Sequence, residues 1–368
     1  MALPPPLPHP WTTRNIRCHT ARVIKGFSVR LLDPRRDTLP PGWDEFRASE
    51  GLHAVWSPQV LGALTALRTP PLLAVCSDAD RIAGVVGGVY LGLRRGTPRP
   101  WREPLIFDMR LPGQSGPPWH FAERVPPAAR RALLRRVERL AARRLGPGCL
   151  GVVYRPLSGG DLALVARRGT FTLESAEGTR MPVEFGSVDE WLRSLSKSRR
   201  TDLRRQVRMI DAAGDLEVAV GVRRTDLDAD ELARMHAAHT AKLAARFDVR
   251  APLPPEYFRA LCERDDVAMV SYRETPSGRL LAWGTLLMAG AAPGLGAWAA
   301  LDPADGGRKH LYFDHYVRLL GLAVESARDA KEPPVLNGGQ GMAEVKRSLG
   351  FETVPMRTLV VPRPLVGR

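Results

Sequence analysis

Apolar residues recur along the first half of the chain in two patterns, alternation over short runs and helical spacing over longer ones. Alternation and short apolar runs predict strands, and positions that repeat every three or four residues predict helices. The predicted strands are 23–32, 72–77, 81–93, 105–111, 151–155 and 171–185. The predicted helices are 43–67, interrupted near residue 57, then 126–145 and the short 162–168.

The second half repeats this order of elements. Its predicted strands are 216–222, 267–274, 279–288, 296–301, 335–337 and 351–361. Its predicted helices are 196–211, 228–247, 255–264, 308–330 and 343–349. A repeated order indicates a duplicated unit. We therefore expect an irregular, proline-rich arm at 1–20, an N-terminal lobe at 21–185 and a C-terminal, catalytic lobe at 186–368.

The two halves end alike, in a short basic helix, a glycine and an aromatic residue that opens the last strand: Gly169 with Phe171, and Gly350 with Phe351. The order hairpin, strand, helix, strand, helix, strand is that of the mixed sheet in GNAT lobes. The expected fold class is therefore α/β, of the α+β mixed-sheet type, with two tandem GNAT-like lobes.

Composition adds a strong positive charge. The formal net charge is +15 with a pI near 10.4, so polyanions are attracted. The four cysteines are scattered without paired spacing, no apolar run approaches the ~18 residues of a membrane span, and no signal-peptide pattern opens the chain. We expect a soluble cytoplasmic protein with reduced thiols and no membrane span.

Two ordered motifs about 140 residues apart resemble those of FemAB-like proteins within the GNAT superfamily, especially the cellulose-biosynthesis-type (CelD-like) branch. The first is the run LSKSRR at 195–200 followed by DLRR at 202–205; the second is NGGQG at 337–341 with Lys346, Gly350 and Phe351. The sequence departs from the pattern at Asn337, where an acid is usual, and at Val345, where an aromatic is usual. The resemblance, over about 186–362, implies acyl transfer from an activated ester to an amine. The donor is acetyl-CoA in some relatives and aminoacyl-tRNA in the Fem set.

The loop before the long helix is the place where GNAT enzymes hold a diphosphate. Its donor-binding candidates are Gly306, Gly307, Arg308, Lys309 and His310. A helix N-terminus and cations favour phosphate there. However, the Q/R-x-x-G-x-G/A spacing is missing and Asp305 would repel a diphosphate. A conventional CoA site is therefore disfavoured.

Basic helices favour RNA as the polyanion. Lys197, Arg200, Arg204 and Arg208 fall on one face of the predicted helix 196–211, and Arg131 and Arg135 lie in the arginine-rich helix near 124–144. Such cations can follow a phosphate backbone, although a solvated basic face explains the same pattern. We expect charged tRNA, not DNA, as the partner.

The candidates for catalysis are Lys346, which matches the lysine of the family motif, His236 and His239 on the inward face of their helix, and Asn337 as an oxyanion or amine ligand. The two histidines could equally be packed core residues. Two histidines three residues apart lack further ligands, so no metal site is expected. His315 points away from the apolar stripe of its helix and is expected at the surface.

The sequence thus predicts an aminoacyl-tRNA-dependent transferase that forms an amide on a small amine or peptide, in specialised metabolism, without a bound cofactor. An acetyl-CoA-dependent N-acetyltransferase is the alternative. A non-catalytic RNA-binding protein on a degenerate GNAT scaffold is a second alternative.

Overall fold

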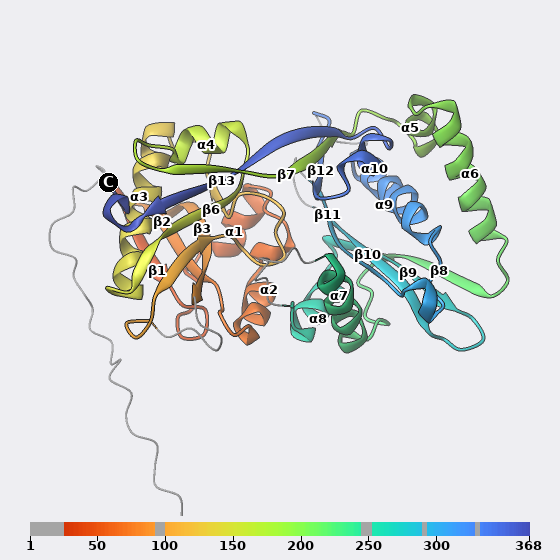
Figure 1. Ribbon diagram of the computed structural model, residues 1–368, viewed down its shortest axis with the longest axis horizontal. Helices are drawn as coiled ribbons and strands as arrows, with labels where there is room; N and C mark the ends of the chain where they lie inside the picture. Colours follow the sequence, from red (N-terminus) through yellow and green to blue (C-terminus); the bar gives the residue numbers. More distant parts are fainter. Residues whose placement is uncertain (1–25, 93–99, 244–251, 289–292, 328–331) are drawn as a thin grey trace, which may run out of the picture.

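The computed structural model describes residues 26–92, 100–243, 252–288, 293–327 and 332–368. Within these ranges a long mixed sheet runs through the molecule, with helices packed on it (Figure 1). The strand order is β1-β2-β3-β4-β6-β13-β7-β12-β11-β10-β9-β8, and the short β5 pairs with β3. This order confirms the predicted mixed-sheet fold class.

The first half contributes one end of the sheet. Its strands are β1 Phe27–Leu32, β2 Leu72–Asp78, β3 Arg81–Gly92, β4 Leu105–Met109, β5 Trp119–Phe121 and β6 Cys149–Leu157. Its α-helices are α1 Trp43–Ser49, α2 Pro58–Ala63, α3 Pro127–Leu145 and α4 Gly159–Val165. Short 3-10 turns at Ala54–Trp56 and Leu64–Ala66 flank α2.

The second half contributes the other end. After two opening helices, its described elements repeat the order of the first half, apart from β5. Its strands are β8 Leu216–Val222, β9 Val267–Glu274, β10 Leu280–Leu287, β11 Gly294–Ala300 and β12 Val335–Gln340. Its helices are α5 Val188–Ser194, α6 Lys197–Asp211, α7 Ala229–Leu243, α8 Pro255–Cys262, α9 Leu311–Ala327 and α10 Ala343–Arg347. Short 3-10 turns at Pro303–Asp305 and Arg363–Leu365 precede α9 and end the chain.

The closing strands of the two halves, β7 Phe171–Pro182 and β13 Glu352–Pro362, are exchanged at the centre of the sheet. β13 pairs with β6 of the first half, and β7 pairs with β12 of the second. The two also pair with each other, antiparallel. The sheet is therefore continuous across residue 185, and the division into lobes at that residue stays a prediction.

Two apolar clusters hold the sheet. One combines the core of the first half with α7, α8 and the side of β10 that carries Trp283; the other lies under α5, α6 and α9. Burial of these side chains is the main force that holds the helices on the sheet. Among the described residues, no helix has the length and apolar character needed to cross a membrane.

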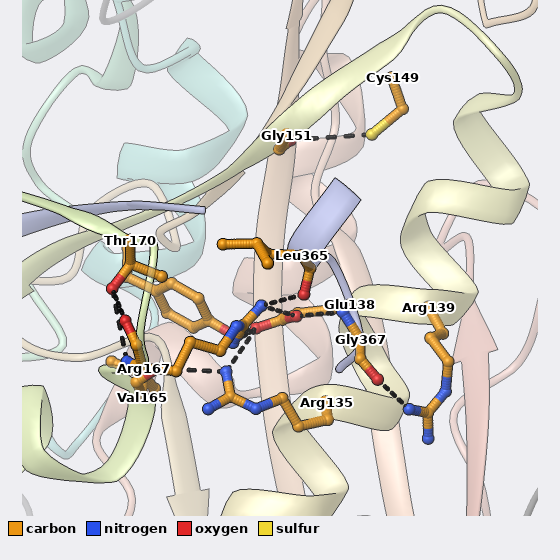
Figure 2. A network of polar contacts seen from close by, with 11 residues as sticks. Arg135, Glu138, Arg139, Cys149, Gly151, Val165, Arg167, Thr170, Leu365 and Gly367 are labelled. Atoms are coloured by element: carbon orange, nitrogen blue, oxygen red, sulfur yellow. Dashed lines mark hydrogen bonds and ion pairs between the residues drawn. The ribbon is translucent and has the colours of Figure 1, made fainter. Parts of the chain in front are cut away.

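A buried carboxylate ties the last residues of the chain to the first half (Figure 2). Glu138 on α3 has no exposed surface and accepts hydrogen bonds from Tyr154 Oη at 2.6 Å, Arg167 Nη2 at 2.6 Å and the Gly367 amide at 2.6 Å. Burial raises the pKa of Glu138, and this effect outweighs the hydrogen bonds, which stabilise the carboxylate and lower the pKa. Arg135, expected to face RNA, points inward, with its Nη1 3.3 Å from Glu138 Oε1 and 3.1 Å from the Val165 carbonyl oxygen.

Candidate active site

The two halves differ where two parallel strands meet beside a long helix. In the first half, β4 and β6 pair along five positions, from Leu105↔Cys149 to Met109↔Tyr154. In the second half, the corresponding β11 and β12 pair at Gly294↔Asn337 alone in the described chain. The second pair therefore separates after its first residues. Where parallel strands separate, their backbone groups are no longer paired with each other and can meet a ligand. We call this point of separation between β11 and β12 the crevice.

A β-bulge in β12 forms one wall of this crevice. The register with β7 shifts between Asn337 and Gly339, and Asn337 Oδ1 accepts a 2.8 Å hydrogen bond from the Gly339 amide. A side chain at Gly338 would collide with Thr179 and with the ring of Phe351. Thr179 of β7 and Phe351, the residue before β13, thus fix the shape of the bulge.

Lys346 is bound to the same bulge. Its Nζ donates a 2.6 Å hydrogen bond to the carbonyl oxygen of Gly338, and the residue is only 7% exposed. Burial lowers the pKa of Lys346 to about 8. A buried amine with a lowered pKa is typical of functional sites, because it can exchange a proton near neutral pH.

A loop of the first half reaches the bulge. Asn337 Nδ2 donates a 3.2 Å hydrogen bond to the carbonyl oxygen of Ser115, and Gly113 packs against the Tyr257 hydroxyl of α8. Both polar atoms of the Asn337 side chain are therefore hydrogen-bonded, Nδ2 to Ser115 and Oδ1 to Gly339. It orients the loop and the bulge, and its role toward substrate stays a prediction.

His315, expected at the surface, is buried at 4% exposure, and this expectation is corrected. Its ring stacks on Trp298 with centroids 4.1 Å apart and also contacts Tyr316. Burial lowers the pKa of His315 to about 3, and the charge of Lys346 contributes. The imidazole is neutral at physiological pH and lies within the electrostatic reach of Lys346.

The two histidines of α7 occupy different surroundings. His236 packs between Phe258 and Trp283, with ring centroids 5.4 Å and 6.3 Å away. His239 lies close enough to Asp302, just after β11, for their charges to interact, but burial lowers its pKa overall. His239 therefore stands near the carboxyl end of β11, where the crevice opens, while His236 is held among aromatic rings.

The first part of the predicted phosphate loop, through Gly307, is closed on itself. The amides of Asp305 and Gly307 donate to the carbonyl oxygen of Asp302, and the Gly306 amide donates to Pro303. Gly307 packs directly on the Leu301 carbonyl, which leaves no room for a side chain. These amides are unavailable to a diphosphate.

The cations and the histidine of this loop are only partly available. Arg308 forms two hydrogen bonds with Asp215, at 2.5 Å and 3.2 Å. Burial lowers the pKa of the half-buried His310, while Lys309 is exposed. Among the side chains expected to bind the donor in this loop, that of Lys309 is the most exposed to solvent.

The basic residues predicted to bind RNA are separated. α3, with Arg131 and Arg135, and α6 lie at opposite ends of the long axis in Figure 1. On α6, Lys197, Arg204 and Arg208 are exposed. Arg204 also pairs with Asp189, Arg208 donates to the Arg204 carbonyl, and Arg200 donates to the Arg193 carbonyl. α6 packs on α9 and lies at the same end of the molecule as α10, which carries Lys346. α3 lies at the other end.

Comparisons with known proteins identify the fold. No protein-family model matches the chain, and no curated protein matches its sequence. Among solved structures, L-PGS from Bacillus licheniformis aligns with a TM-score of 0.55 at 12% identity, over 89% of this chain and 97% of that one. FemX aligns with a TM-score of 0.54 at 11% identity, over 92% and 98%.

A third structure, the C-terminal domain assigned to a lysylphosphatidylglycerol synthetase of Agrobacterium fabrum, aligns with a TM-score of 0.54 at 12% identity, over 88% of this chain and 92% of that one. Identities this low show a common fold. The chain has a fold like that of FemX and L-PGS, as the FemAB-like motifs implied.

Proposed function

We propose that the chain is an acyltransferase that uses aminoacyl-tRNA to form an amide on a small amine or peptide. The observation that carries the proposal is the crevice between β11 and β12, with the buried Lys346 bound to its bulged wall. The first half lacks this opening, because β4 and β6 stay paired. The proposed transfer site is therefore in the second half.

The reaction requires two proton movements. The amine nitrogen attacks the ester carbon, the new C–N bond forms, and the C–O bond to the ribose breaks. The amine loses one proton and the leaving ribose oxygen takes one. The ammonium of Lys346 stabilises the oxyanion and supplies the proton to the leaving oxygen; the neutral His239, at the mouth of the crevice, accepts the proton from the amine.

The choice of donor rests on the closed loop before α9. A diphosphate needs free amides, and the amides of Asp305, Gly306 and Gly307 are bound inside the loop. The exposed cations of α6 instead suit a polyanion whose charge is spread along a backbone. Both features favour charged tRNA, present in the cytoplasm, over acetyl-CoA.

The similar folds of FemX and of the lysylphosphatidylglycerol synthetase domain support this choice. The name of the latter states an aminoacyl product, a lysyl group joined to phosphatidylglycerol. For this chain we propose an amine acceptor from specialised metabolism, which enters beside Asn337 and the Ser115 loop.

Binding of the two donors side by side tests the proposal. Uncharged tRNA and acetyl-CoA are titrated separately into the full chain, the first by fluorescence anisotropy and the second by calorimetry. We expect tRNA to bind in the micromolar range or tighter, with an affinity that falls as salt rises. Acetyl-CoA binding without tRNA binding would replace the proposal by an N-acetyltransferase. Binding of tRNA to a chain that never transfers would favour an RNA-binding protein.

A further inference from the structure

A groove of about 560 Å³ lies where the start of α6 meets the end of α10, outside the crevice. Two guanidinium groups line it, those of Arg199 and Arg347, together with the hydroxyl-bearing Ser196 and Ser198. Ser194 and Ser348 also line it, but their hydroxyls donate to the Trp191 and Val345 carbonyls. Guanidinium forks and hydroxyls are the groups that bind phosphate oxygens. The proposed reaction as described above makes no use of this groove.

Arg199 is held in place by an aromatic ring. Its guanidinium carbon lies 4.9 Å from the centroid of Phe313 on α9, and its side chain is 25% exposed. Stacking on an aromatic face fixes a guanidinium without neutralising its charge. Arg199 therefore presents a positioned cation to the groove.

One carboxylate also lines the groove and is engaged elsewhere. Asp202 Oδ1 accepts from Arg205 at 2.8 Å, and Asp202 Oδ2 accepts from Gln206 at 2.7 Å. Arg199 is farther from it, at 3.7 Å. The charge of Asp202 is thus balanced on α6 itself, and Arg199 keeps capacity for a second anion.

Arg347 has a partner that it can exchange. It lies 3.4 Å from Glu177, and both side chains are about half exposed. Such surface pairs contribute ~0–1 kcal/mol, so a phosphate can displace the carboxylate at little cost. Arg347 follows Lys346 directly, so the groove and the crevice lie on two sides of the same short helix.

We propose that this groove binds a backbone phosphate of the RNA that carries the acyl group. The inference rests on the proposed function, and it adds the point at which the RNA is anchored beside Lys346. The exposed Lys197, Arg204 and Arg208 continue the positive charge from the groove along α6. The RNA backbone then follows α6 and is clamped between Arg199 and Arg347 before its 3′ end enters the crevice.

The test compares two matched arginines in the full chain. Arg347→Gln removes the groove cation, and Arg180→Gln removes a similar exposed arginine, 3.3 Å from Glu352, that lies on β7 and does not line the groove. Anisotropy measures the affinity for uncharged tRNA at several salt concentrations. We expect Arg347→Gln to weaken binding about tenfold and to reduce the salt slope by about 0.7–0.9, the change expected for one phosphate contact. Arg180→Gln should leave both unchanged.

A second variant separates charge from geometry. Arg199→Lys keeps the charge but loses the planar fork, and we expect a smaller loss of affinity than for Arg347→Gln, with an unchanged unfolding temperature. Equal binding by the wild type, Arg347→Gln and Arg199→Lys would overturn the groove while leaving tRNA as donor. Loss of acetyl-CoA binding in Arg347→Gln, with RNA binding intact, would assign the phosphate to CoA and overturn the RNA anchor. A wild type that binds no RNA would overturn both proposals together.

Discussion

Lys346 and Gly338 are joined by a 2.6 Å hydrogen bond from the lysine Nζ to the backbone carbonyl oxygen. The bond links α10 to the bulge in β12, at the point where β12 has separated from β11. One side chain thus fixes the wall of the crevice, and in the proposed reaction the same side chain supplies a proton.

Lys346→Met should lower the rate of transfer by ~10²–10⁴, the usual contribution of a positioned proton donor. Burial lowers the pKa of Lys346 to about 8, so the ammonium is lost above that value. The kcat of the wild type should therefore fall as the pH rises from 7 to 9. Lys346→Arg, which stays charged, should be slower but show no such fall. A wild-type rate that is flat through pH 8 would contradict the role of Lys346 as an acid.

The buried His315 should make the protein sensitive to acid. Its pKa is about 3 in the folded chain and near 6.5 when unfolded, so below pH 6.5 only the unfolded state binds the proton. At pH 5 this difference destabilises the fold by about 2 kcal/mol. His315→Phe keeps a ring against Trp298 and removes the titration.

Urea unfolding at pH 7 and pH 5 measures this effect. The loss of unfolding free energy between the two pH values should be about 2 kcal/mol smaller in His315→Phe than in the wild type. An identical loss in both proteins would mean that His315 is not buried in its neutral form.

Gly338→Ala should disrupt the bulge, because the added methyl group would collide with Thr179 and Phe351. We expect a loss of ~1–3 kcal/mol of unfolding free energy, as for an overpacked core, together with loss of transfer. Gly159→Ala is the matched control, since a methyl group there meets no atom within 4 Å. A fully active Gly338→Ala would show that the bulge is not needed for the reaction.

The exchanged strands predict that neither half folds alone. Residues 26–185 would lack β13, the partner of β6, and residues 186–368 would lack β7, the partner of β12. Circular dichroism and gel filtration of the two fragments should show unfolded or aggregated chains, and co-expression should restore a complex. A folded, monomeric 186–368 fragment would contradict this prediction.

The local elements could be predicted from the sequence, whereas their long-range pairings could not. Apolar spacing identified α3, α7 and α9 to within a few residues at most of the ends that the structure describes. Gly350 adopts positive φ at the end of α10, as expected, whereas Gly169, also at positive φ, lies in a turn beyond α4, which ends at Val165. The exchange of β7 and β13 depends on which strands pair across the sheet, and the local pattern of apolar residues does not determine that pairing. The three-residue β5 is too short to show alternation.

His315 shows how a single position is misjudged, and Arg135 shows how a basic helix can direct one cation inward. A helix with one narrow apolar stripe would expose His315, but the face of α9 that packs on the sheet is wide enough to include it, and its ring stacks on Trp298 of β11. Arg135 lies in a basic helix, yet it turns toward Glu138, the buried acid of that helix. The lone Glu138 among so many arginines was the available signal for an internal ion pair.

Transfer from charged tRNA is the most direct test of the central claim. The full chain is incubated with tRNA carrying radiolabelled amino acids and with a small-molecule extract as the source of amines, and the products are treated with mild alkali, which cleaves the ester but not an amide. We predict an alkali-stable labelled product with the wild type and none with Lys346→Met. Label that enters the product from acetyl-CoA, and none from aminoacyl-tRNA, would contradict the account.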